Sequence, residues 1–383
     1  MDAAGTTDAL WRTRLEGALG PSEAERFARF ALERVSRTFA LNIRVLPPPL
    51  RGQVLHAYLY CRMADTLEDD AELPAPQKSA LLRAFAALFD PGLDASVREP
   101  MAAAFTALLP AGWKAKDAAW EHVLLARTPL VLRACSRMPA PARAAVCACV
   151  REMCGGMAAF ALRQHAVQTR GGALISTVRE LDDYCWFVAG TVGVFLADRF
   201  IADGRISGER AARMRAQCVS FGNGLQLVNI LKDLAEDARR GVSWLPADLL
   251  EREGLSAATF GNPENRAAAR RVHAALFHKA LSHLEEALDY TLAIPATRRR
   301  LRLFCLWPLQ MAVETLALLA ENAGALAGGA RLKLTRARVH AIVRRTSLLW
   351  WSDRALRSGF RAPADRIRRA LHDAGPGHTF HAP

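Results

Sequence analysis

Apolar residues recur at intervals of three and four positions along most of this 383-residue chain. That spacing places them on one face of an α-helix, and we find no sustained apolar–polar alternation typical of strands. The expected helices cover residues 21–36, 50–70, 118–137, 140–164, 175–200, 210–238, 265–293, 297–322 and 334–359, with two or three more between 78 and 109. The pattern therefore predicts an all-α protein with one domain.

The two ends of the chain are the least regular parts. Residues 1–20 resemble a short helix or a loose arm, and they lack the apolar segment of a signal peptide. Residues 361–383 are rich in Arg, His, Pro and Gly and predict a flexible basic tail. We place the domain at residues 21–360.

Charge adds a preference for anionic partners. Lys and Arg number 51 against 38 Asp and Glu, so the net charge is 51 − 38 = +13. Such a balance favours phosphorylated small molecules, nucleic acid or an anionic membrane surface, although a solvated basic surface would give the same numbers. No motif or aromatic interleaving supports nucleic-acid binding.

Cysteine usage and the longest apolar stretch bear on location. The eight cysteines fall largely in apolar helical runs without CxxC or zinc-type spacing, which predicts reduced thiols in a cytoplasmic protein. Residues 303–320 are interrupted by Pro308, Gln310 and Glu314, which disfavours a membrane span. We expect a cytoplasmic protein, with peripheral contact to the inner membrane face as an option and a monomer favoured.

Two acidic clusters carry the clearest chemical signal. Each has carboxylates at i, i+3 and i+4 of an expected helix: Asp65, Glu68 and Asp69 in the first, and Asp233, Glu236 and Asp237 in the second. Like charges gathered on one helix face repel each other. Two such faces in one chain suggest that a divalent metal compensates both.

Neutral oxygen donors extend the second cluster. Gln226 and Asn229 precede its carboxylates on the same helical stripe, and a donor set made only of oxygens suits Mg²⁺. A solvent-exposed acidic helix end is the plain alternative for either cluster alone. Nearby arginines could neutralise phosphate oxygens: Arg37, Arg51, Arg62, Arg239 and Arg240.

Three histidines lie five residues apart on one expected helix, at His273, His278 and His283. Steps of five rotate about 140° on a helix, so the three share no face and are poor joint metal ligands. We predict surface or boundary positions for them.

These residues resemble, in order along the chain, the motifs of the squalene and phytoene synthases, which join two prenyl diphosphates head to head. The matching blocks are 36–39 (SRxF), 60–70 (first aspartate-rich motif), 184–193 (YCxxVAGxVG), 226–237 (QxxNIxxDxxED) and the basic loop 240–246. The resemblance implies a single isoprenoid-synthase helical fold around a central apolar cavity.

The resemblance also implies roles for individual residues. Mg²⁺ would bind Asp65, Asp69, Asn229, Asp233 and Asp237, with Glu68 and Glu236 as further acidic members of the metal site. Substrate would contact Ser36, Arg37, Phe39, Tyr58, Arg62, Gln226, Arg239 and Arg240. Tyr184 and Arg62 would act in catalysis, and ring faces such as Trp186 could stabilise a carbocation. Asp70 is expected at the ordinary surface.

A later segment resembles squalene synthases rather than phytoene synthases. Residues 304–316 are similar to their FCxxPxxMAxxTL block, which makes Phe304 a catalytic candidate. Lys333 and Arg336 resemble the element associated with the NADPH phosphates. Six basic residues gather there, and a lipid- or solvent-facing surface is the open alternative: Arg331, Lys333, Arg336, Arg338, Arg344 and Arg345.

The predicted function is Mg²⁺-dependent condensation of two farnesyl diphosphates through presqualene diphosphate, followed by NADPH reduction to squalene. The bacterial-type enzymes without a C-terminal membrane anchor are the expected relatives. Trp186–Phe187 stands where squalene synthases often have His-Tyr. Because of this departure, a phytoene or dehydrosqualene synthase without the reductive step is the alternative. A non-catalytic relative acting as an assembly factor is a third, weaker option.

Overall fold

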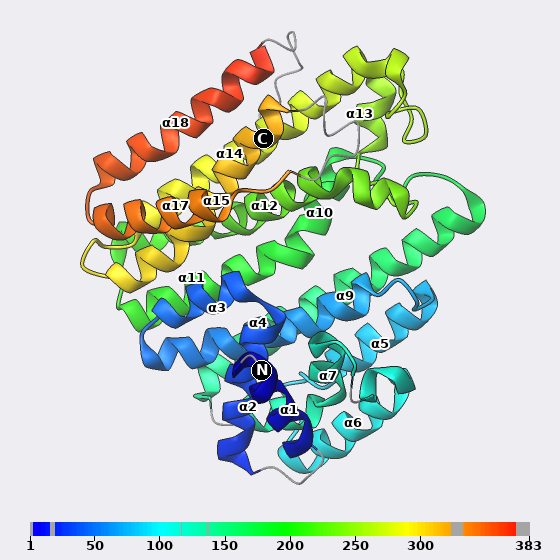
Figure 1. The fold of residues 1–383 in the computed structure, drawn as a ribbon, viewed down its shortest axis with the longest axis vertical. Coiled ribbons are helices and arrows are strands. Elements are labelled where there is room, and N and C mark those ends of the chain that lie inside the picture. Colours follow the sequence, from blue (N-terminus) through cyan, green and yellow to red (C-terminus); the bar gives the residue numbers. More distant parts are fainter. Residues whose placement is uncertain (1–2, 16–19, 116, 136–137, 323–331, 373–383) are drawn as a thin grey trace. The chain divides into compact units, whose positions relative to one another are not determined.

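The computed structural model describes residues 3–15, 20–115, 117–135, 138–322 and 332–372. Every regular element within these ranges is a helix, so the all-α prediction is confirmed (Figure 1). The chain divides into two compact units, Met1–Leu162 and Arg163–Pro383. The expectation of one domain stays a prediction.

Unit 1 is built from short helices and one long one. Its elements are α1 (Ala3–Arg14), α2 (Pro21–Val35), α3 (Arg37–Val45), α4 (Pro48–Asp69), α5 (Ala75–Ala87), α6 (Ala95–Leu108), the 3₁₀ turn η1 (Ala111–Lys114), α7 (Trp120–Ala126), α8 (Thr128–Cys135) and the first part of α9 (Ala140–Arg170). The predicted helix 118–137 is thus two helices, which meet at Arg127.

Helix α4 positions the first acidic cluster, and local sequence explains both of its ends. Pro47 and Pro48 stop α3 and begin α4, because proline cannot donate a backbone hydrogen bond inside a helix. Along α4 the buried residues include Leu59, Tyr60 and Met63. The Tyr60 hydroxyl donates to the carbonyl of Val131 at 3.1 Å, which ties α4 to α8.

Unit 2 contains longer helices. They are the end of α9, α10 (Val178–Cys185), the π turn η2 (Trp186–Gly190), α11 (Thr191–Gly204), α12 (Gly208–Arg239), α13 (Ala247–Arg252), the 3₁₀ turn η3 (Pro263–Asn265), α14 (Arg266–Ala293), α15 (Arg299–Glu321), α17 (Arg336–Leu349) and α18 (Asp353–His372). Helices α12 and α14 form its most extensive contact, and α11 and α15 also pack on α12.

Two glycines let the π turn and α11 approach α12 closely. A Cβ atom at Gly222 would lie 2.2 Å from the Ala189 carbonyl oxygen, and one at Gly193 would lie 2.1 Å from the Cys218 carbonyl oxygen. Only hydrogen fits at either position. The small residues of the 184–193 block therefore serve backbone packing.

The polar interruptions of the apolar stretch 303–320 are explained by the last two helices. Glu314 is buried in α15, and its carboxylate pairs with Arg338 of α17 at 2.6 Å and Arg366 of α18 at 3.1 Å. Gln310, also buried, accepts from Arg345 of α17 at 3.0 Å. Burial of polar groups is tolerated here because each one finds a partner.

Three sequence expectations differ from the structure. The predicted helix 334–359 is two helices, α17 and α18, separated by a turn at residues 350–352. The described part of the predicted tail 361–383 is helical up to His372 and buries Ile367 and Leu371. His273 is buried against the rings of Phe260 and Phe277 and is not a surface residue.

Three helical segments of the described residues are long and apolar enough to cross a membrane, judged by length and composition alone: Ala140–Arg170, Val178–Gly204 and Arg299–Glu321. More than half of the apolar window of the first and third, and less than half of the second, is buried within the protein. The cytoplasmic location stays a prediction.

Candidate active site

The acidic face of α4 is half-buried, and its carboxylates crowd one another. Burial raises the pKa of Asp65 to about 7; the charge of Asp69 adds to the rise and that of Arg62 opposes it. The pKa of Glu68 is also raised, first by burial and then by Asp69 and Asp65, with Lys78 opposing. These acids hold their negative charge poorly unless a cation joins them.

Arg62 lies one helical turn before Asp65, as the sequence predicted. Its guanidinium forms an ion pair with Glu121 of α7 at 3.4 Å, and its buried Nε donor has no hydrogen-bond partner among the described residues. A buried donor without an acceptor is costly. The predicted role of Arg62 in binding an anionic substrate stays a prediction.

Ser36, Phe39 and Tyr58 lie together in unit 1. The Ser36 hydroxyl caps α3 by accepting from the Phe39 backbone N–H at 3.2 Å, and it shares a hydrogen bond with the Tyr58 hydroxyl. The rings of Phe39 and Tyr58 lie 5.1 Å apart. Burial raises the pKa of Tyr58 to about 12. Arg37 begins α3, but its side chain lies outside the described part of the chain.

Asp70 is a structural residue, contrary to the prediction of an ordinary surface position. Its carboxylate accepts from the backbone N–H groups of Glu72 and Leu73 at 2.9 and 3.0 Å and pairs with His122 at 3.2 Å. It therefore shapes the turn that ends α4.

The acidic face of α12 carries its own cations. Lys232 contacts Asp233 at 3.1 Å and donates to the Asn229 amide oxygen at 3.3 Å. Arg240 pairs with Glu236 at 2.9 Å. The remaining predicted members, Gln226, Asp237 and Arg239, lie along the same helix, with Arg239 exposed at its end.

Tyr184 contacts a residue that sequence reasoning did not select. Its ring is nearly buried and stacks on the Trp244 ring at a centroid distance of 3.9 Å. Trp244 belongs to the loop after α12, so this stack joins the 184–193 block to the basic loop. The π turn begins at Trp186, two residues after Tyr184; such turns are frequent at functional sites. In the sequence, the only sign of this contact was that Trp244 is an aromatic residue within a basic loop.

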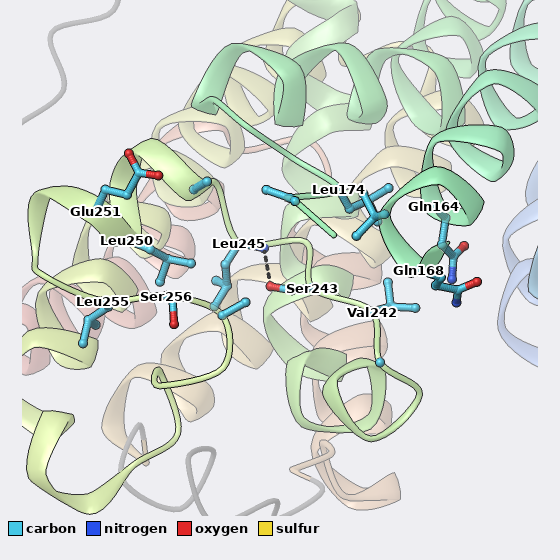
Figure 2. A pocket seen from close by; sticks show the side chains of 16 residues that line it. Gln164, Gln168, Leu174, Val242, Ser243, Leu245, Leu250, Glu251, Leu255 and Ser256 are labelled. Carbon is cyan, nitrogen blue, oxygen red and sulfur yellow. Dashed lines mark hydrogen bonds between the residues drawn. The ribbon is translucent and has the colours of Figure 1, made fainter. Parts of the chain in front are cut away.

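A pocket of about 350 Å³ lies beside this loop within unit 2. Figure 2 shows Leu174, Val242 and Leu245 on its apolar lining, with Gln164 and Gln168 from the end of α9 at one side. The Leu245 backbone N–H donates to the Ser243 hydroxyl at 3.4 Å, as the dashed line marks. Its lining includes Gly241, Val242 and Ser243, which directly follow Arg239 and Arg240 in the chain.

The residues predicted for later steps lie elsewhere in unit 2. Phe304 is buried in α15, and its ring meets Phe200 of α11 edge-on at 5.4 Å. The structure thus gives it a packing role, and its catalytic role stays a prediction. Lys333 and Arg336 are exposed at the start of α17. Arg331 lies outside the described residues.

The sequence did not predict that Cys61, Cys149 and Cys154 would lie close to one another near the first acidic face. The Cys61 thiol shares a hydrogen bond with that of Cys149, and this bond and burial raise its pKa. Burial likewise raises the pKa of the Cys154 thiol. Buried thiols that resist ionisation are unreactive, and the described cysteines are free, as predicted.

The two acidic faces suit a divalent metal by donor type. Within the described residues no three His, Cys, Asp or Glu side chains converge to hold a metal. Either helix alone therefore supplies at most two acidic side chains, and water or phosphate oxygens would complete the coordination, which Mg²⁺ prefers. The crowded carboxylates of α4 also fit, because a cation would restore their charged forms.

Known proteins resemble this chain over most of its length. The profile described as squalene/phytoene synthase matches residues 32–338. Squalene synthase of Schizosaccharomyces pombe is 27% identical over 294 residues, covering 76% of this chain and 58% of that protein. Squalene synthase BSS of Botryococcus braunii is 30% identical over 311 residues, covering 80% and 61%. The chain spans about three fifths of the length of these relatives.

Solved structures of similar proteins also match most of this chain. A ligand-bound structure of TcSQS is 25% identical, with a TM-score of 0.70, and the match covers 92% of this chain and 97% of that one. A ligand-bound dehydrosqualene synthase is 19% identical, with a TM-score of 0.55 and coverage of 87% and 98%. The second likeness concerns the fold alone.

Proposed function

This chain belongs to the squalene/phytoene synthase family, and on that premise we propose that it joins two farnesyl diphosphates head to head. The first product is presqualene diphosphate, which NADPH then reduces to squalene. The observation that carries the proposal is the pair of helices α4 and α12, each with Asp side chains four positions apart, within the stretch that matches the family.

In the first step the C1–O bond of one farnesyl diphosphate breaks, and the diphosphate leaves with the electron pair. The double bond of the second molecule attacks the allylic cation, and loss of a proton closes a cyclopropane ring. Mg²⁺, when bound, would offset the charge of the departing diphosphate. Arg62, Arg239 and Arg240 would hold the phosphate oxygens that the metal does not reach.

Aromatic and hydroxyl groups of the chain would guide the cation. The Tyr184–Trp244 stack and the Phe39–Tyr58 pair offer ring faces, which attract positive charge more strongly than apolar side chains do. Because its pKa is about 12, Tyr58 stays protonated at neutral pH and serves as a donor. Tyr184 would assist proton transfer or stabilise the cation.

In the second step the C–O bond of presqualene diphosphate breaks and the cation rearranges. A hydride from NADPH then ends the reaction and leaves NADP⁺. The exposed Lys333 and Arg336 support this step, since a 2′-phosphate needs cationic partners. Without the hydride, loss of a proton would give dehydrosqualene, which is the alternative product.

The test is a product assay on the purified protein with Mg²⁺ and either farnesyl diphosphate or the C20 diphosphate, with and without NADPH. Mass spectrometry identifies the diphosphate and hydrocarbon products. We expect presqualene diphosphate without NADPH and squalene with it. Dehydrosqualene in both samples would contradict the reductive step, and turnover only of the C20 diphosphate would indicate phytoene. The double variant Asp65→Asn/Asp233→Asn should give no product, while Asp203→Asn, an exposed Asp of α11, should match the unmodified protein.

A further inference from the structure

The turn between α17 and α18 exposes two large apolar side chains. Leu348 is 67% exposed and Trp351 is 60% exposed, the two highest values among large apolar residues in the described part of the chain. Leu348 lies in the last turn of α17, and Trp351 follows in the turn that leads to α18. A single exposed apolar side chain is ordinary, but a neighbouring pair that includes Trp marks a contact surface.

Hydrogen bonds from one buried arginine fix this turn in place. Arg302 of α15 donates to the Trp350 carbonyl at 3.2 Å and pairs with Asp353 at 2.6 Å. The same guanidinium donates to the carbonyls of Ile294 at 2.6 Å and Leu292 at 3.1 Å. The α17–α18 turn and the α14–α15 turn are thereby held side by side, at the same end of unit 2 (Figure 1).

Five exposed arginines belong to the α17–α18 turn, its flanking helices and the start of α15, which Arg302 joins to that turn. Arg298, Arg299 and Arg300 stand where α15 begins, and the Arg299 guanidinium lies 5.7 Å from the centre of the Trp350 ring. Arg344 precedes Leu348 by one turn of α17, and Arg354 follows the turn. No carboxylate of the described residues forms an ion pair with these five arginines.

The acids at this end do not cancel that charge. Asp353 is engaged by Arg302. The neighbouring α11–α12 turn, which Arg210 joins to the carbonyl of Ala293 at 3.1 Å, carries Asp203 and Glu209. Glu209 pairs with an arginine of its own helix at 2.9 Å, and Arg205 is exposed on the same turn. The surface therefore stays basic.

We propose that the surface formed by Leu348, Trp351 and these five arginines docks the protein on an anionic phospholipid bilayer. Tryptophan prefers the membrane interface, where its ring is buried and its N–H stays hydrated. Each arginine near an anionic surface contributes about 1 kcal/mol. Apolar and basic groups on one rigid corner suit such a surface better than they suit a soluble anion, which would leave Leu348 and Trp351 in water.

The test is co-sedimentation of the full chain with vesicles of phosphatidylcholine alone or with phosphatidylglycerol added. We expect binding only to the anionic vesicles, and weaker binding at high salt. Leu348→Ser/Trp351→Ser should weaken binding about tenfold or more. Arg298→Gln/Arg299→Gln/Arg300→Gln should weaken it about 100-fold, at about fivefold for each charge.

Matched controls lie elsewhere on the molecule. Leu108, 59% exposed in unit 1, and the exposed arginines Arg266 and Arg270 of α14 provide Leu108→Ser and Arg266→Gln/Arg270→Gln, which should bind as the unmodified chain does. Circular dichroism confirms folding of each variant.

Three results would overturn the proposal. They are equal binding to neutral vesicles, equal losses in the test and control variants, or no vesicle binding together with a dimer that Leu348→Ser/Trp351→Ser dissociates. The last result would assign the surface to contact between copies of the chain. The assay measures no catalysis, so its outcome is independent of the proposed reaction.

Discussion

The carboxylates of α4 and α12 share one spacing but differ in how far burial and nearby cations affect them. On α4, Asp65 and Glu68 are half-buried beside other acids, and burial raises the pKa of both. On α12, Lys232 and Arg240 of the same stretch of chain contact Asp233 and Glu236 directly. On the first face burial outweighs the attraction of the nearby Arg62 and Lys78. On the second, Asp233 and Glu236 each contact a cation directly.

This difference shows what spacing determines and what it leaves open. Carboxylates at i, i+3 and i+4 must share a helix face. Whether that face is charged depends on the residues that pack against it. If the two faces bind a metal, as proposed, binding on α4 would relieve repulsion between carboxylates, and binding on α12 would displace Lys232 from Asp233.

The largest expected effect tests whether both faces are needed. Asp65→Asn and Asp233→Asn should each lower kcat/KM about 10³-fold, the order seen when one group that stabilises developing charge is lost. Steady-state kinetics with farnesyl diphosphate and Mg²⁺ measures this, with Asp203→Asn as the control. Near-normal activity of one variant would mean that only the other face acts.

The next effect compares the backbones of the two helices. Gly222→Ala on α12 should destabilise the protein by about 3 kcal/mol, an overpacking cost, because its Cβ would lie 2.2 Å from a carbonyl oxygen. Gly52→Ala on α4 meets nothing within 4 Å and should stabilise it by up to about 1 kcal/mol. Urea unfolding checks both. Equal effects would show that the glycines of α12 are not needed for close packing.

A third prediction uses pH to measure what one buried histidine of unit 2 contributes to stability. Burial lowers the pKa of His273 to about 4, below its ordinary value of about 6.5. The unfolded chain therefore binds the proton first, and the stabilisation present above pH 6.5 falls as the pH drops towards 4. The loss should reach about 2 kcal/mol at pH 5.

His273→Leu should remove this part of the pH dependence, while His340→Gln, at an exposed position of α17, should leave it. The measurement is urea unfolding between pH 5 and 7, followed in unit 2. An unchanged slope in His273→Leu would place the titration elsewhere.

The smallest expected effect comes from replacing Lys232 of α12. Lys232→Gln should lower the Mg²⁺ concentration for half-maximal activity about fivefold, because about 1 kcal/mol of competing attraction is removed. Arg240→Gln, at a more exposed pair, should shift it about twofold or less. Titration of activity with Mg²⁺ distinguishes them. A higher requirement in Lys232→Gln would mean that the lysine helps to bind substrate instead.

Much of the helical order could be predicted, because apolar periodicity and proline breaks act locally. The turn at residues 350–352 could not, since no proline or glycine marks it; bonds from Arg302, some fifty residues earlier, hold it. The pairing of Tyr184 with Trp244 and the burial of His273 likewise depend on which helices meet. Asp70 was misjudged because a capping carboxylate and a surface carboxylate look alike in sequence. The roles of the site residues stay predictions.

Arg302 has a consequence for the entropy of any contact at the α17–α18 turn. Its guanidinium holds acceptors from two separate turns, and a lysine ammonium, with three donors on one atom, could not span them. Fixing one backbone residue costs about 1–2 kcal/mol. Because these turns are already ordered, a partner surface would meet a rigid body, and little further freedom would be lost on association.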